Sequence, residues 1–305
     1  VMLALAAWLY IYFNVFSAVA FFGWYVFQLG PYTLMLHNVC HRRYFKSEVA
    51  WLEWPFIAFL GMFFGHSPGA YFAHHIGMHH PENNMDDDLS STLHLQRDSA
   101  LDFFYHYLGR FLTLGKIDLG SYLSDRNRDK LLKRMRRGTA IWFAVVVVLL
   151  FVNWKATLLV FVATLLVTRT AMMSGNWAQH AFVDASDPNN CYLNSITCIN
   201  STYNRRCFND GYHISHHWKP ARHWTEHPKE LKDNIEAYAE ADAIIFRKLD
   251  YFAIWVFLML KRYDKLADHY VTIDERQRSK EEIIELLKDR TRRIEQPELV
   301  AAGAF

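Results

Sequence analysis

The first 36 residues of this 305-residue chain lack any charged side chain. Residues 121–138 and 264–298 are, by contrast, densely charged, so a mean hydropathy near zero conceals two kinds of segment. Long uncharged segments next to charged ones are typical of membrane proteins that also carry a water-facing part. We therefore interpret the chain as an integral membrane protein.

Motifs of several common enzyme classes are also missing. The chain has no HExxH and no ExxH pair, which excludes the usual zinc-protease site and the carboxylate di-iron sites of soluble four-helix bundles. It has no GxGxxG and no phosphate-binding loop, which excludes the usual dinucleotide and nucleoside-triphosphate sites. The net charge is only +2, and no basic stretch is interleaved with aromatic residues, which argues against nucleic acid as a partner.

Cysteine is scarce, and its spacing excludes further sites. The four cysteines form no CxxC pair and are Cys40, Cys191, Cys198 and Cys207. We predict buried free thiols, with a zinc or disulfide role as the alternative. The chain has neither a cysteine pattern for an iron–sulfur cluster nor an HPGG haem-binding stretch. Electrons for any redox reaction must therefore come from a separate protein.

Histidine, in contrast, is abundant and clustered. Ten of the sixteen histidines fall into four short patches, which are His37-Asn-Val-Cys-His41, His74-His75-Ile-Gly-Met-His79-His80, Asn176-Trp-Ala-Gln-His180 and His213-Ile-Ser-His216-His217. Helical residues four apart are separated by only about 40° around the axis, so such pairs can aim at one point. In the second patch His75, His79 and His80 spread over roughly 140°, whereas His74 lies on the far side, so His75 is the better candidate.

These patches predict metal binding. Neutral imidazole is the commonest metal-binding side chain, and it suits iron, zinc, copper and nickel. The nine candidate ligands exceed what one ion can hold, so two metals are implied. We interpret the isolated histidines as ordinary core or surface residues; these are His66, His94, His106, His223, His227 and His269.

The apolar segments predict one membrane domain over residues 1–305. Residues 1–36 are long enough to form a first span, although Gly30-Pro31 is expected to kink or restart the helix. Residues 55–65 are too short to cross and are predicted to be re-entrant or interfacial. Residues 139–173 are predicted to form a transmembrane hairpin, and residues 174–305 a cytosolic cap with C-terminal helices. Two crossings in the hairpin place all the histidine patches on one side of the membrane.

Charged and amphipathic segments refine this topology. Arg42, Arg43 and Lys46 follow the first patch, which predicts that this side is cytoplasmic. The aromatic segment 101–114 is amphipathic and is expected to lie in the membrane interface.

Each of two further charged segments allows two interpretations. The acidic stretch 81–88 is predicted to be a solvated loop that caps a following helix, with shaping of a substrate entrance as the alternative. Residues 125–137 carry seven basic side chains against two aspartates, which predicts contact with lipid headgroups or, alternatively, with an acidic electron-transfer partner.

As a set, the HxxxH, HxxxHH and HxxHH boxes, with Asn176-xxx-His180 between the second and the third, resemble the membrane fatty-acid desaturase and hydroxylase superfamily. The layout is similar to the stearoyl-CoA desaturase type over nearly the whole chain, including the box separations and the apolar hairpin. The resemblance implies an all-α, mushroom-shaped integral membrane fold. It has transmembrane and interfacial helices, a helical cytosolic cap and a bent acyl tunnel.

The same resemblance implies two iron ions, with dioxygen as the co-substrate that removes hydrogen from an unactivated CH₂ group. Carried over by position, the iron ligands and catalytic residues are His37, His41, His75, His79, His80, His180, His213, His216 and His217, with Asn176 reaching one iron through water.

The implied partners are a fatty acid or fatty-acyl substrate, membrane lipids and an electron donor of the ferredoxin or cytochrome b5 type. Acyl-CoA desaturases of animals present Arg-Asp before the second box, where this chain has Ala73-His74. The acyl carrier therefore remains open between a free acid, coenzyme A, an acyl-carrier protein and a lipid ester.

A fatty-acid desaturase is the function we expect. The alternatives among enzymes are a hydroxylase and a decarboxylase that converts free fatty acids to terminal alkenes, because the HxxxH and HxxxHH spacings also occur in hydroxylases. A metal-binding membrane transport protein is the non-enzymatic alternative. It predicts histidines that line a pore, whereas the topology places every box on one side.

Overall fold

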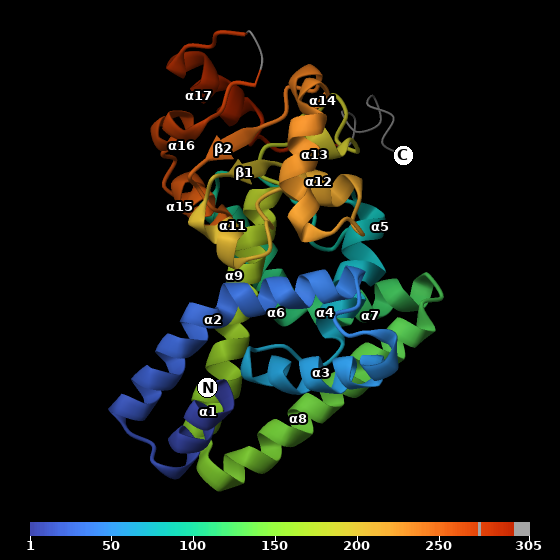
Figure 1. Cartoon of the computed structure of the whole chain (residues 1–305), viewed down its shortest axis with the longest axis vertical. Helices are drawn as coiled ribbons and strands as arrows, with labels where there is room; N and C mark the ends of the chain where they lie inside the picture. The colour runs from blue at the N-terminus through green and yellow to red at the C-terminus, as the bar shows by residue number, and fades with distance from the viewer. Residues whose placement is uncertain (274–275, 296–305) are drawn as a thin grey trace. The chain divides into compact units, whose positions relative to one another are not determined.

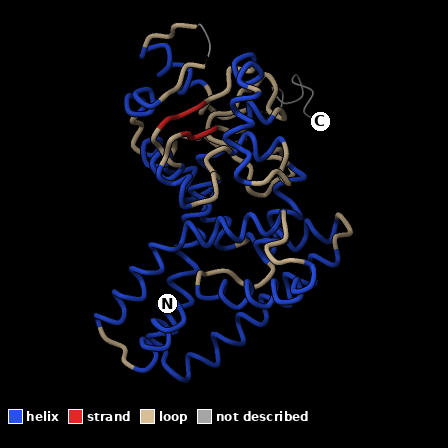
Figure 2. The backbone as a smooth tube through the Cα atoms, viewed as in Figure 1, coloured by secondary structure: helices blue, strands red, loops and turns tan. Residues whose placement is uncertain are grey.

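The computed structural model describes residues 1–273 and 276–295 and is mostly helical (Figure 1, Figure 2). The chain divides into two compact units: unit 1 comprises Val1–Met78 and Ile117–Thr170, and unit 2 comprises His79–Lys116 and Ala171–Phe305. Within the predicted cap segment 174–305, residues 274–275 and 296–305 lie outside the described residues.

Unit 1 is built from helices. Their bounds are α1 (Met2–Ile11), α2 (Val15–His41), η1 (Ser47–Leu52), α3 (Glu53–Phe63), α4 (Ala70–His74), α7 (Gly115–Asp125), α8 (Asp129–Thr157) and η4 (Leu158–Ala163). Of these, α7 has its first two residues in unit 2. Two further helices begin in unit 1 and end in unit 2: η2 (His75–His79) and α9 (Thr164–Gln179).

The first apolar segment, predicted as one span over 1–36, contains two helices. The backbone leaves the helix after Ile11, and the Asn14 side chain caps α2 by accepting from the Ser17 amide at 3.0 Å. Helix α2 then continues through Pro31 to His41, so the helix does not restart at Gly30-Pro31. An uninterrupted helix keeps the remaining backbone groups paired, which an apolar environment requires.

The second long apolar segment bends at Asn153. This residue has φ −156° and ψ 95°, and its side-chain oxygen accepts from the Ala156 amide at 3.1 Å, which caps the helix that follows. The bend falls between the two halves of the predicted hairpin 139–173. Two stretches of the described chain are long and apolar enough to cross a membrane, Val15–His41 and Asp129–Gln179, and only 28% of the most apolar window of each is buried. Helices so exposed are not the core helices of a soluble protein.

Unit 1 is held together by close contacts between helices. The Tyr25 hydroxyl donates to the Thr164 carbonyl at 3.0 Å and lies 2.7 Å from the Thr168 hydroxyl. Gly138 of α8 lies against the turn before α4, where a Cβ atom on this glycine would be 1.7 Å from the Pro68 carbonyl oxygen. Glycine is therefore required at this crossing.

Unit 2 has shorter elements. Its helices are α5 (His80–Glu82), η3 (Asp102–Gly109), α6 (Arg110–Thr113), α10 (Cys191–Asn194), α11 (Thr202–Arg206), α12 (His213–Trp218), η5 (Trp224–Glu226), α13 (His227–Asp233), α14 (Ile235–Glu240), α15 (Tyr251–Met259), α16 (Tyr263–His269) and α17 (Lys280–Asp289). Strands β1 (Thr197–Ile199) and β2 (Ile245–Arg247) pair in parallel. The prediction of an all-α fold missed this sheet, because three-residue strands are too short to show an alternating pattern.

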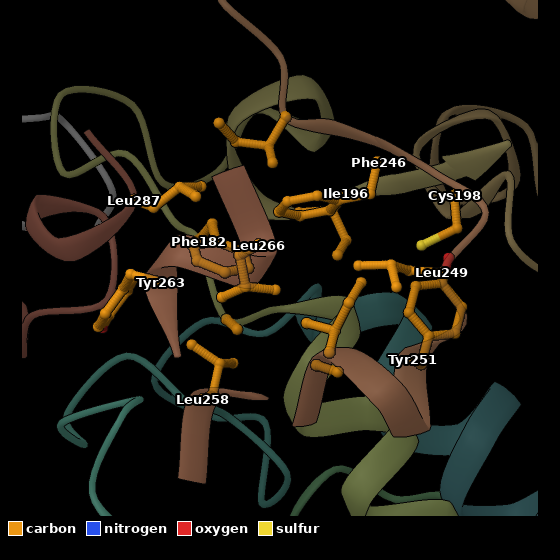
Figure 3. Close-up of a cluster of buried hydrophobic side chains, with 14 of the residues drawn as sticks. Phe182, Ile196, Cys198, Phe246, Leu249, Tyr251, Leu258, Tyr263, Leu266 and Leu287 are labelled. Atoms are coloured by element: carbon orange, nitrogen blue, oxygen red, sulfur yellow. The ribbon is translucent and has the colours of Figure 1, made fainter. Parts of the chain in front are cut away.

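The core of unit 2 surrounds this sheet. Phe182, Ile196, Phe246 and Leu266 are buried side by side with residues of α15 and α17 (Figure 3). The guanidinium of Arg97, also fully buried, donates to a set of backbone carbonyls: those of Thr92, Leu93, Ala181, Arg290 and Arg292. These bonds connect the segment before η3 to the end of the chain's last described helix.

All four cysteines are free, as predicted. Cys198 and Cys207 are buried, whereas Cys40 and Cys191 are partly exposed.

Candidate metal centre

Four histidines of unit 2 converge on one point. They come from the end of η2, the residue after α9, and α12, and they are His79, His180, His213 and His217. Each ring contributes one nitrogen, and these four nitrogens all lie within 4.8 Å of one another. The Nε2 atoms of His180 and His213 are 3.3 Å apart. We call these four residues the cap cluster.

A second pair of unit 2 adjoins the same sequence boxes. The Nε2 atoms of His80 and His216 are 3.0 Å apart. His216 and His217 are neighbours on α12, yet His217 belongs to the cap cluster and His216 pairs with His80. The HH dipeptides of the second and third boxes therefore direct their two rings to different neighbours.

A third group lies within unit 1. His37 and His41 stand one turn apart on α2, and the Nε2 atoms of His41 and His75 are 2.9 Å apart. The rings of His37 and His75 meet edge to face with centroids 4.4 Å apart. The structure thus brings the first box together with His75. His74 lies outside these histidine groups in the described part of the chain.

The second box is wound more loosely than predicted. Residues His75–His79 form a π-helical turn rather than a regular α-helical one. The angle of roughly 140° expected for an α-helix therefore does not apply to this box. Single π turns inside α-helices often occur at functional sites. Sequence periodicity cannot reveal a π turn, because a single wider turn changes the helical period over only a few residues.

The cap cluster fits a metal ion. Two nitrogens bound at about 2.1 Å to one ion lie about 3.0–3.4 Å apart, and the His180–His213 separation of 3.3 Å falls in this range. Burial, reinforced by His79, lowers the pKa of His180 to about 4. Burial and the neighbouring histidines also hold the pKa of His217 well below its usual range. Both rings are therefore neutral at pH 7, which is the form that binds metals.

A carboxylate orients one ring of the cap cluster. Asp88 is 3% exposed, and its Oδ2 lies 2.7 Å from His79 Nδ1. The same carboxylate accepts from the backbone amides of Asn84 and Ser90 and from the Ser90 hydroxyl. A carboxylate on the outer nitrogen fixes the tautomer and ring orientation of a metal-binding histidine.

Two asparagines orient two more rings. Asn83 Oδ1 lies 2.9 Å from His217 Nδ1, and Asn194 Oδ1 lies 2.8 Å from His180 Nδ1. With Nδ1 occupied on the outer side, each of these rings can direct Nε2 toward the cluster.

The acidic stretch 81–88 was predicted to be a solvated loop, and for Asp88 this prediction is wrong. Asp86 and Asp87 are exposed, but Asp88 is buried. The chain turns inward because Asn83 and Asn84 both adopt the left-handed conformation, with φ values of 47° and 64°. Asparagine tolerates this conformation better than most residues. The consecutive asparagines, followed by an aspartate close to a histidine box, were the available signal.

Asn176 has a defined orientation. Its amide nitrogen donates to the Tyr107 hydroxyl at 2.7 Å and to the Ser90 carbonyl at 3.0 Å. Tyr107 is buried, and burial raises the pKa of its hydroxyl far above the ordinary value, so it remains protonated. Asn176 therefore has its side-chain NH₂ group held by two acceptors, which fixes the direction of its side-chain oxygen, Oδ1.

Three of the isolated histidines have ordinary hydrogen-bond partners. His94 pairs with Asp86, His227 Nδ1 lies 2.8 Å from the Ser215 hydroxyl, and His269 Nδ1 lies 2.8 Å from the Arg247 carbonyl oxygen. His66, His106 and His223 likewise lie outside the histidine groups of the described residues.

Residues 65–69 match the Gly-x-Ser-x-Gly pattern of hydrolase nucleophiles, but not its structural context. That motif requires an exposed serine on a turn between a strand and a helix. Here the pattern forms the turn between α3 and α4, and Ser67 is 3% exposed. The segment is therefore a close-packed turn of unit 1, and it does not support hydrolase activity.

Comparison with known proteins gives one result. A family model described as fatty acid desaturase matches residues 7–248, which is most of the chain and includes every histidine box. No curated protein and no solved structure matches the chain.

Proposed function

The chain belongs to the fatty acid desaturase family, and from this we propose that it is an oxygen-dependent membrane oxidoreductase that acts on fatty-acyl chains. The reaction we favour is desaturation of a fatty acid or fatty-acyl lipid. The observation that carries this proposal is the cap cluster, a largely buried set of imidazoles, three of which are oriented from outside by Asp88, Asn83 and Asn194.

The proposed metals are two irons. The ligand set that we carry over from the sequence resemblance contains nine histidines, with Asn176 acting through water. The cap cluster supplies four of them for one iron.

Iron with dioxygen would supply the oxidising power needed to break an unactivated C–H bond. The residues of the chain have three tasks around it. The imidazoles provide neutral ligands, Asp88 and the two asparagines hold the rings, and burial of the cap cluster keeps water away from the reacting atoms. With its side-chain NH₂ group bound to Ser90 and Tyr107, Asn176 would present its side-chain oxygen, Oδ1, to a water molecule at the metal centre.

We further propose a multi-pass topology with the metal centre facing the cytoplasm. Its support is that two described stretches can span a membrane and that Arg42, Arg43 and Lys46 directly follow the first box. The electron donor would be a separate ferredoxin or cytochrome b5 type protein. Lys130, Lys133, Arg136 and Arg137 at the start of α8 are exposed and are candidates to contact either that donor or lipid headgroups.

Hydroxylation and oxidative decarboxylation remain the alternative reactions, because the same metal chemistry can end in either. They are distinguished by product. Purified iron-loaded protein would be incubated with dioxygen, an electron donor and an isotope-labelled fatty acid, and the lipids analysed by mass spectrometry. Loss of two hydrogens indicates desaturation, gain of oxygen indicates hydroxylation, and loss of carbon dioxide with a terminal alkene indicates decarboxylation.

Two controls separate this proposal from a metal transport protein. Omission of dioxygen should abolish product, and His180→Ala should lower both iron content and turnover, whereas the half-buried His223→Ala, outside the histidine groups, should change neither. An iron-replete protein that forms no product from free, CoA-linked or esterified acyl chains would overturn the enzymatic function.

A further inference from the structure

Three buried polar groups of unit 1 have no hydrogen-bond partner among the described residues. They are the Thr33 hydroxyl, the His66 Nε2 atom and the Ser67 hydroxyl, and the three residues are 8%, 8% and 3% exposed. A buried polar group without a partner destabilises the folded chain, so such groups are few in folded proteins and call for an explanation. A ligand that supplies the missing hydrogen bonds would explain all three.

The three groups lie where α2, the turn between α3 and α4, and α9 meet. Tyr32, next to Thr33, stacks on Phe64 with ring centroids 4.1 Å apart, and its ring centroid is 6.1 Å from that of His66. On the other side of the turn, the Thr168 hydroxyl of α9 donates to the Phe64 carbonyl at 2.7 Å. The turn is thus held between two long helices.

This turn has little room to rearrange. Gly65 has a φ of +74°, and a Cβ atom there would be 2.4 Å from the Thr164 carbonyl oxygen of α9. The backbone that carries His66 and Ser67 is therefore pressed against α9. Close packing of this kind prevents the two side chains from finding partners by a small shift of the turn.

The local charge is positive. Burial, together with the nearby Arg169 of α9, lowers the pKa of His66 to about 3, so the imidazole is neutral at pH 7 and the cation is the guanidinium. The segments that supply these elements contain no aspartate or glutamate; they are residues 15–41, 54–75 and 130–170. An ionisable side chain in a stretch that can span a membrane usually has a functional role.

The same place adjoins the histidine group of unit 1. Thr33 stands one turn before His37 on α2, so both lie on the same side of that helix. The Tyr71 ring lies 5.8 Å from the His66 ring and stacks on the His75 ring at 5.3 Å between centroids. One aromatic ring therefore separates His66 from a proposed iron ligand.

We propose that these polar groups form a subsite that binds the carboxylate of a free fatty acid. The inference rests on the proposed function and names its substrate as the free acid rather than a CoA, carrier-protein or lipid ester. The subsite comprises Thr33, His66, Ser67 and Arg169.

The chemistry of the subsite matches a carboxylate. Two hydroxyls, an imidazole N–H and a guanidinium offer donors to the two carboxylate oxygens, which together accept about four hydrogen bonds. A phosphate head group fits less well, because it carries a bulky glycerol or nucleotide part and the three unpartnered groups are buried. A carboxylate is the smallest anion that a fatty chain can bring to this place.

The position of the subsite has a consequence for the reaction. An acyl chain held by its carboxylate at His66 would begin beside Tyr71 and His75. The carbons nearest the carboxyl group, rather than those in the middle of the chain, would then lie closest to the proposed metals.

The test measures binding, so that its failure is distinct from a failure of the proposed oxidation. Full-length protein in nonionic detergent is titrated with tritiated palmitic acid or its methyl ester, and scintillation proximity counts the ligand held by the protein. The variants are Ser67→Ala and Arg169→Gln. Matched controls are Ser121→Ala and Arg137→Gln, which change exposed residues of the same unit.

We expect palmitic acid to bind more tightly than its methyl ester, and each subsite variant to weaken binding of the acid about tenfold or more while leaving the ester unchanged. Both controls should bind the acid like the unmodified chain. Because Ser67→Ala removes a hydroxyl that has no partner, it should not lower the unfolding temperature of the ligand-free protein.

Three results would overturn the carboxylate subsite. One is equal affinity of the unmodified protein for acid and ester, and another is unchanged affinity for the acid in Ser67→Ala. The third is a lower unfolding temperature in Ser67→Ala with loss of both ligands, which would make the hydroxyl part of the fold. Tight, variant-sensitive binding of the acid without any product would instead keep the subsite and refute the proposed oxidation.

Discussion

Asp88 Oδ2 lies 2.7 Å from His79 Nδ1, and both side chains are buried. A carboxylate here makes the imidazole a better donor to a metal and prevents the ring from rotating. We predict that Asp88→Ala lowers the iron affinity about 10- to 100-fold, and that Asp88→Asn, which keeps an acceptor but loses the charge, has a smaller effect. Chelator competition followed by elemental analysis measures both. The control is Asp87→Asn, which changes an exposed neighbour. An equal loss of iron affinity in that variant would show that Asp88 has no specific role at the site.

Asn194 connects the ring of His180 to the inward turn of the second box. Its NH₂ group donates to the carbonyls of Asn83 and Pro188, both at 2.7 Å, and its Oδ1 accepts from Asn84. Asn194→Ala should lower the free energy of unfolding by about 1–3 kcal/mol for each buried group that loses its partner.

Thermal unfolding in detergent, followed by the protein's tryptophan fluorescence, checks this expectation for Asn194. The exposed Asn189→Ala serves as the comparison. If both variants unfold at the same temperature as the unmodified chain, the network around Asn194 contributes nothing to stability.

Tyr107 holds the amide of Asn176. Tyr107→Phe removes one of the two acceptors of the Asn176 side-chain NH₂ group but leaves the four histidines of the cap cluster unchanged. We expect iron content to stay near that of the unmodified protein, while turnover falls because the amide is free to rotate. Tyr105→Phe, on the same helix but 70% exposed, should affect neither quantity. A parallel loss of iron in Tyr107→Phe would instead indicate that this hydroxyl supports the fold of the site.

Gly138 and Gly23 form a matched pair for the packing of unit 1. A Cβ atom at Gly138 would be 1.7 Å from the Pro68 carbonyl oxygen, whereas a Cβ atom at Gly23 would meet nothing within 4 Å. Gly138→Ala should therefore prevent α8 from packing against this turn and reduce the yield of monodisperse protein. Gly23→Ala should be neutral, or slightly stabilising because alanine favours the helix by about 1 kcal/mol. Size-exclusion profiles of the two variants in detergent measure the difference.

Features that depend on residue type and spacing were predictable from the sequence. The histidines of the boxes lie close together within each unit, and the four cysteines are free. Family membership, too, followed from the boxes, because their pattern is local in the sequence. The set of nine histidine ligands with Asn176 stays a prediction.

Features that depend on backbone geometry were missed. The first apolar segment is divided into two helices before Asn14, which caps the second of them. The hydrophobicity of residues 1–36 gives no sign of this division. The π turn at His75–His79 changes which side each ring faces without changing the residues. The role of Asp88 depends on two successive left-handed residues that bring an acidic loop inward, and such a turn has no hydrophobic period.

Three rings of the cap cluster have an outer hydrogen-bond partner within the protein. His79, His180 and His217 each have an Nδ1 partner supplied by the protein, so their rings do not depend on a bound ion for orientation. The metal-free protein is therefore expected to keep these nitrogen donors in place. Loading of the proposed iron should then be a reversible exchange with a folded receptor, so that the iron content follows the metal supply rather than the folding of the chain.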